Sequence, residues 1–131
     1  MVCKKPLILI VDDDEKWLLT IQNILGDDYK YTTSTRGKEA IDLFKTDMFS
    51  LVIIDKRLED MSGVEVLREM SLINANLGAI ILIGYPDFDS AVESLKIGAL
   101  DYVSKGDRNL SVKLKITVSK SLKKVFEKEE Q

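Results

Sequence analysis

Residues 7–15 read LILIVDDDE, so five aliphatic residues lead directly into four acidic ones. A continuous aliphatic run of this length is typical of a strand buried on both faces, as in a parallel sheet covered by helices. Two carboxylates about 4 Å apart repel each other by ~4 kcal/mol at an effective dielectric constant of ~20. Several acids in one pocket therefore raise a pKa or recruit a cation. The stretch predicts both a covered sheet and a charged site at its edge.

Strand-like and helix-like segments alternate along the rest of the chain. Strands are expected over 29–33, 51–54, 79–83 and 102–103, and helices over 17–25, 37–45, 64–70, 88–95 and 110–126. This alternation is typical of a parallel sheet with helices on both faces. We therefore predict an α/β fold, a doubly wound (βα)5 arrangement with a five-stranded parallel sheet. It is expected to form a single domain over residues 1–131, with a core of about 6–126.

The composition excludes several kinds of site and partner. The chain contains no histidine, which excludes histidine-based zinc sites, Ser-His-Asp triads and histidine general bases. With 19 basic and 22 acidic residues, the net charge of −3 gives no reason to expect nucleic acid or a membrane surface. The opening MVCKKP makes a poor signal peptide, and the single Cys3 fits a reducing compartment. A cytoplasmic location is expected.

Charged residues follow three of the expected strands. Asp12 and Asp13 follow the first strand, Asp55 ends the third, and Lys105 lies just past the fifth. In open α/β sheets, ligands bind beyond the carboxyl ends of the strands. We therefore expect these four residues to surround one crevice. A small set of oxygen ligands suits Mg²⁺, which keeps several waters and binds through one or two carboxylates plus a substrate phosphate.

The chemistry that such a crevice favours is phosphoryl transfer. A carboxylate can attack phosphorus and form an acyl phosphate, while a metal ion and an ammonium neutralise charge on the transferring group. Asp55 stands alone on its strand and is better placed to attack than Asp12 or Asp13. Strands also end in Asp simply because Asp favours turns. Turn preference would explain Asp55 taken alone. It explains poorly why Asp12, Asp13, Asp55 and Lys105 all lie at strand ends.

The chain resembles the receiver domain of two-component response regulators over residues 6–126. The resemblance rests on three stretches, ILIVDDDE at 8–15, LVIIDKRLEDMSGVEVL at 51–67 and DFDSAVESLKIGALDYVSKG at 87–106. It implies a flavodoxin-like strand order 2-1-3-4-5. It also implies a sensor histidine kinase or phosphotransfer protein as phosphodonor, and a downstream effector protein that responds to the phosphorylated form.

The resemblance also implies a role for each charged residue. Asp55 would be the phosphoacceptor, and Lys105 would pair with a phosphoryl oxygen. Asp13 would bind Mg²⁺ (or Mn²⁺) directly together with Asp55, and Asp12 would act largely through water. The backbone carbonyl of Arg57 would be a further metal ligand. Phosphorylation and dephosphorylation would be self-catalysed, rather than the work of a conventional enzyme.

Ile83 departs from the family pattern, which usually has Thr or Ser at the end of the fourth strand. That hydroxyl normally bonds the phosphoryl group, and a hydrogen bond to a charged group is worth ~1.5–3 kcal/mol. Its loss would weaken the active state by about tenfold or more. The alkyl group would also obstruct Tyr102, which matches the aromatic that swings inward on activation. The alternative is a degenerate receiver that acts as a phosphorylation-independent interaction module.

Smaller features have structural explanations. Trp17 is expected to pack in the core or on the face of its helix, and Asp14 to be an acid favoured by the dipole at a helix N-terminus. In the last helix, Val112, Ile116 and Val125 lie outside the main apolar stripe and are compatible with a homodimer through the fourth and fifth helices. The lysines of that helix are expected to form its solvated side, because the overall charge is negative.

A second family fits part of the pattern. The motif Asp12-x-Asp14 after a strand is similar to the opening motif of haloacid-dehalogenase-like phosphatases, in which Asp12 would be the nucleophile. Lys16 stands where that family has Thr or Val, and 131 residues is short for it. Substitution of Asp12 or of Asp55 would distinguish the two alternatives.

Overall fold

Five parallel strands form one sheet in the computed structural model, which describes residues 4–84, 92–93 and 95–129. The strands are β1 (Leu7–Val11), β2 (Lys30–Ser34), β3 (Leu51–Asp55), β4 (Ala79–Ile83) and β5 (Asp101–Ser104). Their order is β2-β1-β3-β4-β5, so the predicted fold class and strand order are confirmed.

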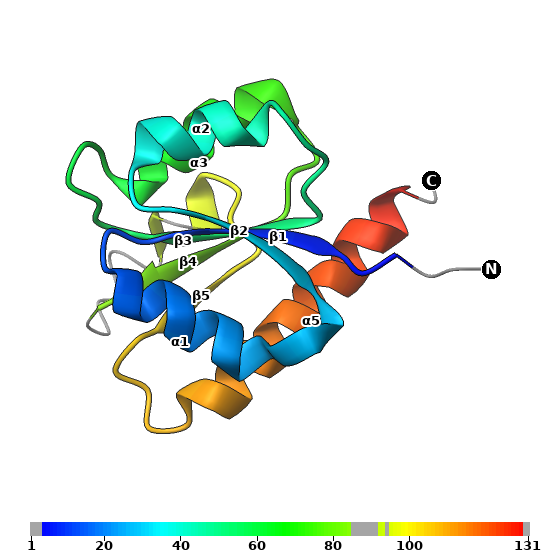
Figure 1. Ribbon diagram of the computed structural model, residues 1–131. Helices are drawn as coiled ribbons and strands as arrows, with labels where there is room; N and C mark the ends of the chain where they lie inside the picture. Colours follow the sequence, from blue (N-terminus) through cyan, green and yellow to red (C-terminus); the bar gives the residue numbers. More distant parts are fainter. Residues whose placement is uncertain (1–3, 85–91, 94, 130–131) are drawn as a thin grey trace.

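The helices form two layers, one on each face of the sheet. They are α1 (Glu15–Leu25), which continues into the 3-10 turn η1 (Gly26–Asp28), α2 (Gly37–Phe44), α3 (Gly63–Ile73) and α5 (Leu110–Glu129). Helices α2 and α3 cover one face, and α1 and α5 cover the other (Figure 1). The helix predicted over 88–95 lies mostly outside the described residues. Among the described residues, none of the helices combines the length and apolar character needed to span a bilayer.

The aliphatic run of β1 enters both cores. Ile8 and Ile10 pack in the cluster beneath α1 and α5, while Leu9 and Val11 pack in the cluster beneath α2 and α3. All four side chains are fully buried. Successive residues of a strand point to opposite faces, so a strand covered on both sides must be apolar at every position. This is why the sequence shows a continuous run instead of an alternating pattern.

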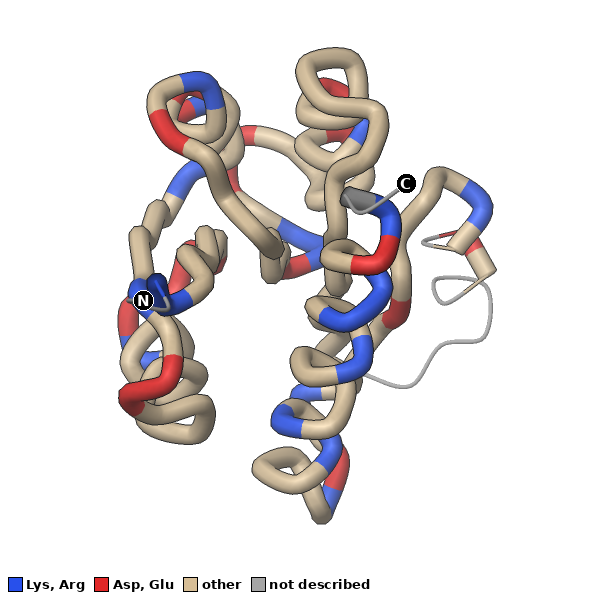
Figure 2. Tube along the Cα trace, turned by 90° about the vertical axis from the view of Figure 1, so that its right-hand side faces the viewer, with Lys and Arg blue, Asp and Glu red and all other residues tan. Residues whose placement is uncertain are grey.

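Helix α5 buries one face and exposes a basic one. Its buried apolar residues are Leu114, Val118, Leu122 and Val125. Val125 is only 7% exposed, and its methyl group fills the space where a Cβ on Gly78 would lie, so the prediction that Val125 belongs to an exposed surface is wrong. Val112 and Ile116 are exposed, as expected. Figure 2 shows basic residues recurring along the outer side of α5, which is solvated as predicted.

The chain after β3 returns tightly upon itself before α3 begins. The Gly63 N–H donates to the carbonyl of Lys56 at 2.7 Å, and the Lys56 N–H donates to Leu82 at the end of β4 at 2.9 Å. A Cβ on Gly63 would overlap the backbone carbonyl of Asp55 and approach Cα of Lys56 at 3.0 Å. Only glycine allows the start of α3 to lie against the strand end that carries Asp55.

We expect Gly63→Ala to lower the free energy of unfolding by about 1–3 kcal/mol, because the added methyl group meets backbone atoms that cannot move aside. Urea unfolding followed by circular dichroism measures the change. Gly106→Ala is the matched control, since a Cβ there meets only ordinary contacts at 3.8 Å. Equal stability of Gly63→Ala and the wild type would show that the close approach is absent in solution.

Candidate functional site

Three carboxylates meet at the carboxyl edge of the sheet. Strands β1 and β3 are neighbours, with Val11 opposite Ile54, so the residues that follow them lie side by side. One carboxylate oxygen from each of Asp12, Asp13 and Asp55 lies within 4.8 Å of the others. Asp12 is fully buried and Asp55 is 8% exposed, whereas Asp13 is exposed. The structure thus brings together the acids that the sequence placed at separate strand ends.

Lys105 is the fourth member of the cluster and follows β5, the strand at one side of the sheet. Its N–H donates to the carbonyl of Ile83 at 2.8 Å. Its Nζ lies 2.7 Å from Oδ2 of Asp12 and donates a hydrogen bond to Oδ2 of Asp55 at 3.1 Å. Burial alone would lower the pKa of Lys105, but the contact with Asp12 and the charge of Asp55 outweigh burial and raise the pKa. The lysine is therefore an ammonium at neutral pH.

The two carboxylate oxygens of Asp12 have different partners. Oδ1 accepts the N–H of Asp14 at 2.9 Å, while Oδ2 lies 2.7 Å from Nζ of Lys105. Burial, the largest cause, raises the pKa of Asp12, although Lys105 and the N–H of Asp14 oppose that shift. Three carboxylates that share one ammonium form a set of oxygen donors that fits a hard divalent cation such as Mg²⁺.

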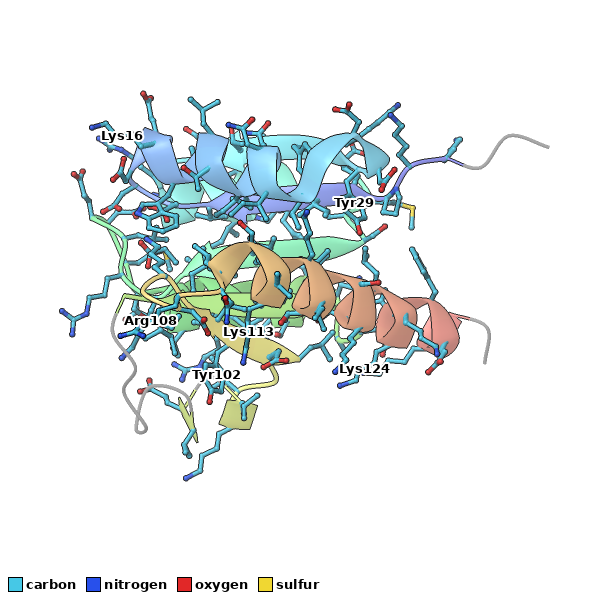
Figure 3. All side chains as sticks on the ribbon, turned by 90° about the horizontal axis from the view of Figure 1, so that it is seen from below. Lys16, Tyr29, Tyr102, Arg108, Lys113 and Lys124 are labelled. Carbon is cyan, nitrogen blue, oxygen red and sulfur yellow. The ribbon has the colours of Figure 1, made fainter. Side chains whose placement is uncertain are left out.

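Three further residues were predicted to have a role in the site, namely Arg57, Ile83 and Tyr102. The N–H of Arg57 lies 3.4 Å from Oδ1 of Asp55, so the Arg57 backbone adjoins the carboxylate, and the role of its carbonyl stays a prediction. Ile83 ends β4 with its side chain buried in the core, and it supplies no hydroxyl. Tyr102 is 38% exposed and lies on the outer side of the molecule, away from Lys16 at the start of α1 (Figure 3).

The first turn of α1 holds a confirmed prediction and a contact that the sequence did not predict. Asp14 is the N-cap of α1, and its side chain accepts the N–H of Lys16 at 2.9 Å, as an acid favoured at that position should. Trp17 is half-buried, and its ring centroid lies 4.9 Å from Nζ of Lys105. Packing on the helix is therefore an incomplete description of Trp17. Spacing could not reveal the contact, because its partners are far apart in sequence.

Asp60 caps a helix from a distant loop. Helix α2 has no side-chain cap of its own, and the N–H groups of Gly37 and Lys38 donate to the two Asp60 oxygens at 2.9 Å each. These bonds, that from Lys38 above all, lower the pKa of Asp60. Asp60 belongs to the segment between Asp55 and α3, so the cap ties that segment to the helix layer. No local pattern around Asp60 or Gly37 indicates this cap.

A family model described as the response regulator receiver domain matches residues 8–116. The transcriptional regulatory protein ZraR of Klebsiella oxytoca is 37% identical over 117 residues, which cover 88% of this chain and 26% of that protein. The sporulation initiation phosphotransferase F of Bacillus subtilis (strain 168) is 30% identical over 99 residues, covering 75% of this chain and 80% of that one. The chain spans about a quarter of the length of the ZraR proteins that it matches.

Solved structures agree with these matches. A CheY-like response regulator receiver domain protein from Methanospirillum hungatei JF-1 superposes with a TM-score of 0.85 at 26% identity. The superposition covers 95% of this chain and 99% of that one. The sequence, the family model and the fold thus favour the receiver over the dehalogenase-like phosphatase.

At pH 7 we expect Asp60→Asn to lower the free energy of unfolding by about 0.5 kcal/mol, because an exposed helix N-terminus loses a charged acceptor. The pKa of folded Asp60 lies below its unfolded value of about 3.9. Its contribution is therefore present above about pH 4 and is lost as the pH falls through the folded pKa. Urea unfolding at several pH values measures the difference between variant and wild type.

The control is Glu59→Gln, which neutralises another exposed acid of the same segment. The free energy of unfolding of Glu59→Gln should differ little from that of the wild type at every pH. A difference for Asp60→Asn that stays constant from neutral to acidic pH would contradict the charged cap.

Proposed function

The chain belongs to the response regulator receiver domain family of two-component systems, and from this premise we propose that Asp55 accepts a phosphoryl group. The donor would be a phosphohistidine on a sensor kinase or on a phosphotransfer protein. One observation carries the proposal, namely that Asp12, Asp13, Asp55 and the ammonium of Lys105 converge at the carboxyl edge of the sheet. An ordinary turn aspartate would not require a buried partner acid and a lysine from two strands away.

The donor set is the basis for proposing a metal ion. Asp13 and Asp55 would bind Mg²⁺ or Mn²⁺ directly, the Arg57 carbonyl would add a ligand, and Asp12 would act largely through water. When bound, the ion supplies positive charge that neutralises the phosphoryl oxygens during transfer. The three carboxylates support this proposal, because one oxygen of each lies within 4.8 Å of the others and oxygen donors are the ligands that Mg²⁺ prefers.

The transfer itself uses groups that are already in position. An oxygen of Asp55 attacks phosphorus, the P–N bond to the donor histidine breaks, and the electron pair leaves with the imidazole nitrogen, which takes up a proton. Nζ of Lys105 contacts Oδ2 of Asp55. After transfer the ammonium would contact an oxygen of the phosphoryl group and neutralise part of its negative charge. An open cavity of about 660 Å³ is lined by Asp13 and Asp14 at the same edge of the sheet, and we propose that the donor approaches from there. Attack of water on the acyl phosphate restores the carboxylate.

Ile83 bears on the response to phosphorylation more than on the chemistry. Its side chain lies in the core beneath α2 and α3 and offers no hydrogen bond to a phosphoryl group. We infer that phosphorylated Asp55 shifts the conformational equilibrium only weakly. The output would be contact with an effector protein or with a second copy of the chain through the fourth and fifth helices. Val112 and Ile116 are exposed on α5. The comparisons do not favour a module that ignores phosphate altogether.

Incubation with a small phosphodonor and Mg²⁺ is expected to add one phosphoryl group to the wild type and none to Asp55→Asn. The increment should disappear when a chelator removes the metal, and it is read by intact-protein mass spectrometry. Asp47→Asn, an exposed acid outside the site, is the control and should behave as the wild type. Modification of Asp55→Asn at the wild-type rate would place the acceptor elsewhere.

Ile83→Thr is expected to enlarge the conformational response to phosphorylation by about tenfold, since a hydroxyl adds a hydrogen bond to a charged group. The measurement is the change in amide NMR shifts around α5 on adding beryllofluoride and Mg²⁺. Ile83→Val is the matched control, because valine has the shape of threonine without its hydroxyl. Equal responses of the Thr and Val variants would remove Ile83 from the coupling.

A further inference from the structure

Lys105 reaches its carboxylate partners across the sheet. It leaves the end of β5, which is separated from β3 by one strand and from β1 by two. A lysine side chain is flexible and carries its charge at the end of a four-carbon stem. Nevertheless Nζ lies within 3.1 Å of both Asp12 and Asp55, and the side chain is only 14% exposed. The two carboxylates attract the ammonium from one side, and the ring of Trp17 lies 4.9 Å from it.

We propose that Trp17 is a positioning residue, whose indole face holds the ammonium of Lys105 against Asp12 and Asp55. An ammonium within about 6 Å of an aromatic centroid is attracted to the ring face, and Trp binds a cation best of the aromatic residues. The inference deepens the proposed function and rests on it, because the lysine is the group that would meet the phosphoryl oxygens. Its action on the reaction would pass through Lys105 alone.

Short-range hydrogen bonds fix the backbone of Trp17 relative to Asp12. The N–H of Asp14 donates to Oδ1 of Asp12 at 2.9 Å, and the N–H of Trp17 donates to the carbonyl of Asp14 at 3.0 Å. The Asp14 side chain, which accepts the N–H of Lys16, closes the same turn. One rigid turn at the start of α1 therefore presents both an acid and an aromatic face, and Lys105 is the flexible partner that enters between them.

Trp17 is expected to matter for the rate of transfer more than for folding. The Lys105 side chain is largely shielded from water, and cation–π attraction is stronger when the cation is desolvated. Without the ring, Nζ would sample positions away from the carboxylates, and fewer molecules would have it ready beside Asp55. Loss of the aromatic face should therefore slow phosphorylation by about three- to thirtyfold, the range that such contacts cover.

The kinetic test compares two substitutions of Trp17 in the full chain. With Mg²⁺ and acetyl phosphate, Trp17→Leu should slow the appearance of the phosphoryl mass increment, and Trp17→Phe should recover at least half of the lost rate. The matched control is Phe49→Leu, which removes a half-buried aromatic that stacks on Phe44 before β3, at the opposite edge of the sheet. In a Lys105→Met background, Trp17→Leu should cause no further slowing, because its effect acts through the lysine.

A spectroscopic test needs no phosphodonor. Trp17 is the single tryptophan of the chain, so all tryptophan emission comes from the ring that faces Lys105. Removing the ammonium with Lys105→Met should shift the emission maximum of the metal-free protein. Lys16→Met, which removes an exposed lysine next to Trp17 in the chain, should leave the maximum nearly unchanged. No shift with Lys105→Met would show that the contact is absent, and would overturn the proposal.

The outcomes separate this proposal from the proposed function. If the wild type is phosphorylated and Trp17→Leu keeps its rate, the positioning role is wrong while the phosphoacceptor stands. If Trp17→Leu and Trp17→Phe are slowed equally, the aromatic face is not the cause and the proposal is again overturned. If the wild type takes up no phosphoryl group, the proposed function fails, and the positioning role in transfer falls with it whatever the emission shows.

Discussion

The ion pair of Lys105 with Asp12 and Asp55 is the interaction on which the site depends. Burial of Asp12 is unfavourable by itself, and a second carboxylate nearby adds to the cost. One ammonium offsets part of this repulsion from a position between the two acids. With Asp13 counted, three ionised carboxylates and one ammonium leave a formal charge of −2 (−3 + 1). The remaining negative charge is what the proposed divalent cation would neutralise.

The fold supplies this cluster with rigid supports. Asp12 and Asp55 extend from neighbouring strands whose apolar residues are locked in two cores, so a shift of either carboxylate would disturb packing on both faces. The segment after β3 is held at one end by the close approach of Gly63, and it is tied to α2 through Asp60. Neither support touches the reacting atoms. Both restrict the backbone that carries Asp55, and preorganisation of this kind is what electrostatic stabilisation of a transition state requires.

The sequence predicts those features that depend on local patterns. An aliphatic run such as Leu7–Val11 predicts a strand that is buried on both faces. Parallel pairing of such strands brings their carboxyl ends together, so the charged cluster was predictable. Strand β2 begins and ends one residue later than expected, because the polar Ser34 is buried and ends the strand although it is typical of a turn. The contact of Trp17 with Lys105, and the cap formed by Asp60, depend on side-chain directions across tertiary contacts. No periodicity or spacing encodes those directions.

In the proposed function, Ile83 separates the chemistry of the site from the response to it. The charged groups of the site come from the ends of β1, β3 and β5, whereas β4, which lies between β3 and β5, ends in an alkyl side chain. That side chain adds to the core beneath α2 and α3, where a hydroxyl would require a partner. Stability at the end of β4 and hydrogen bonding to a phosphoryl group are therefore competing demands on one position. An apolar residue there retains every charged group of the proposed transfer and removes the contact through which β4 would respond to it.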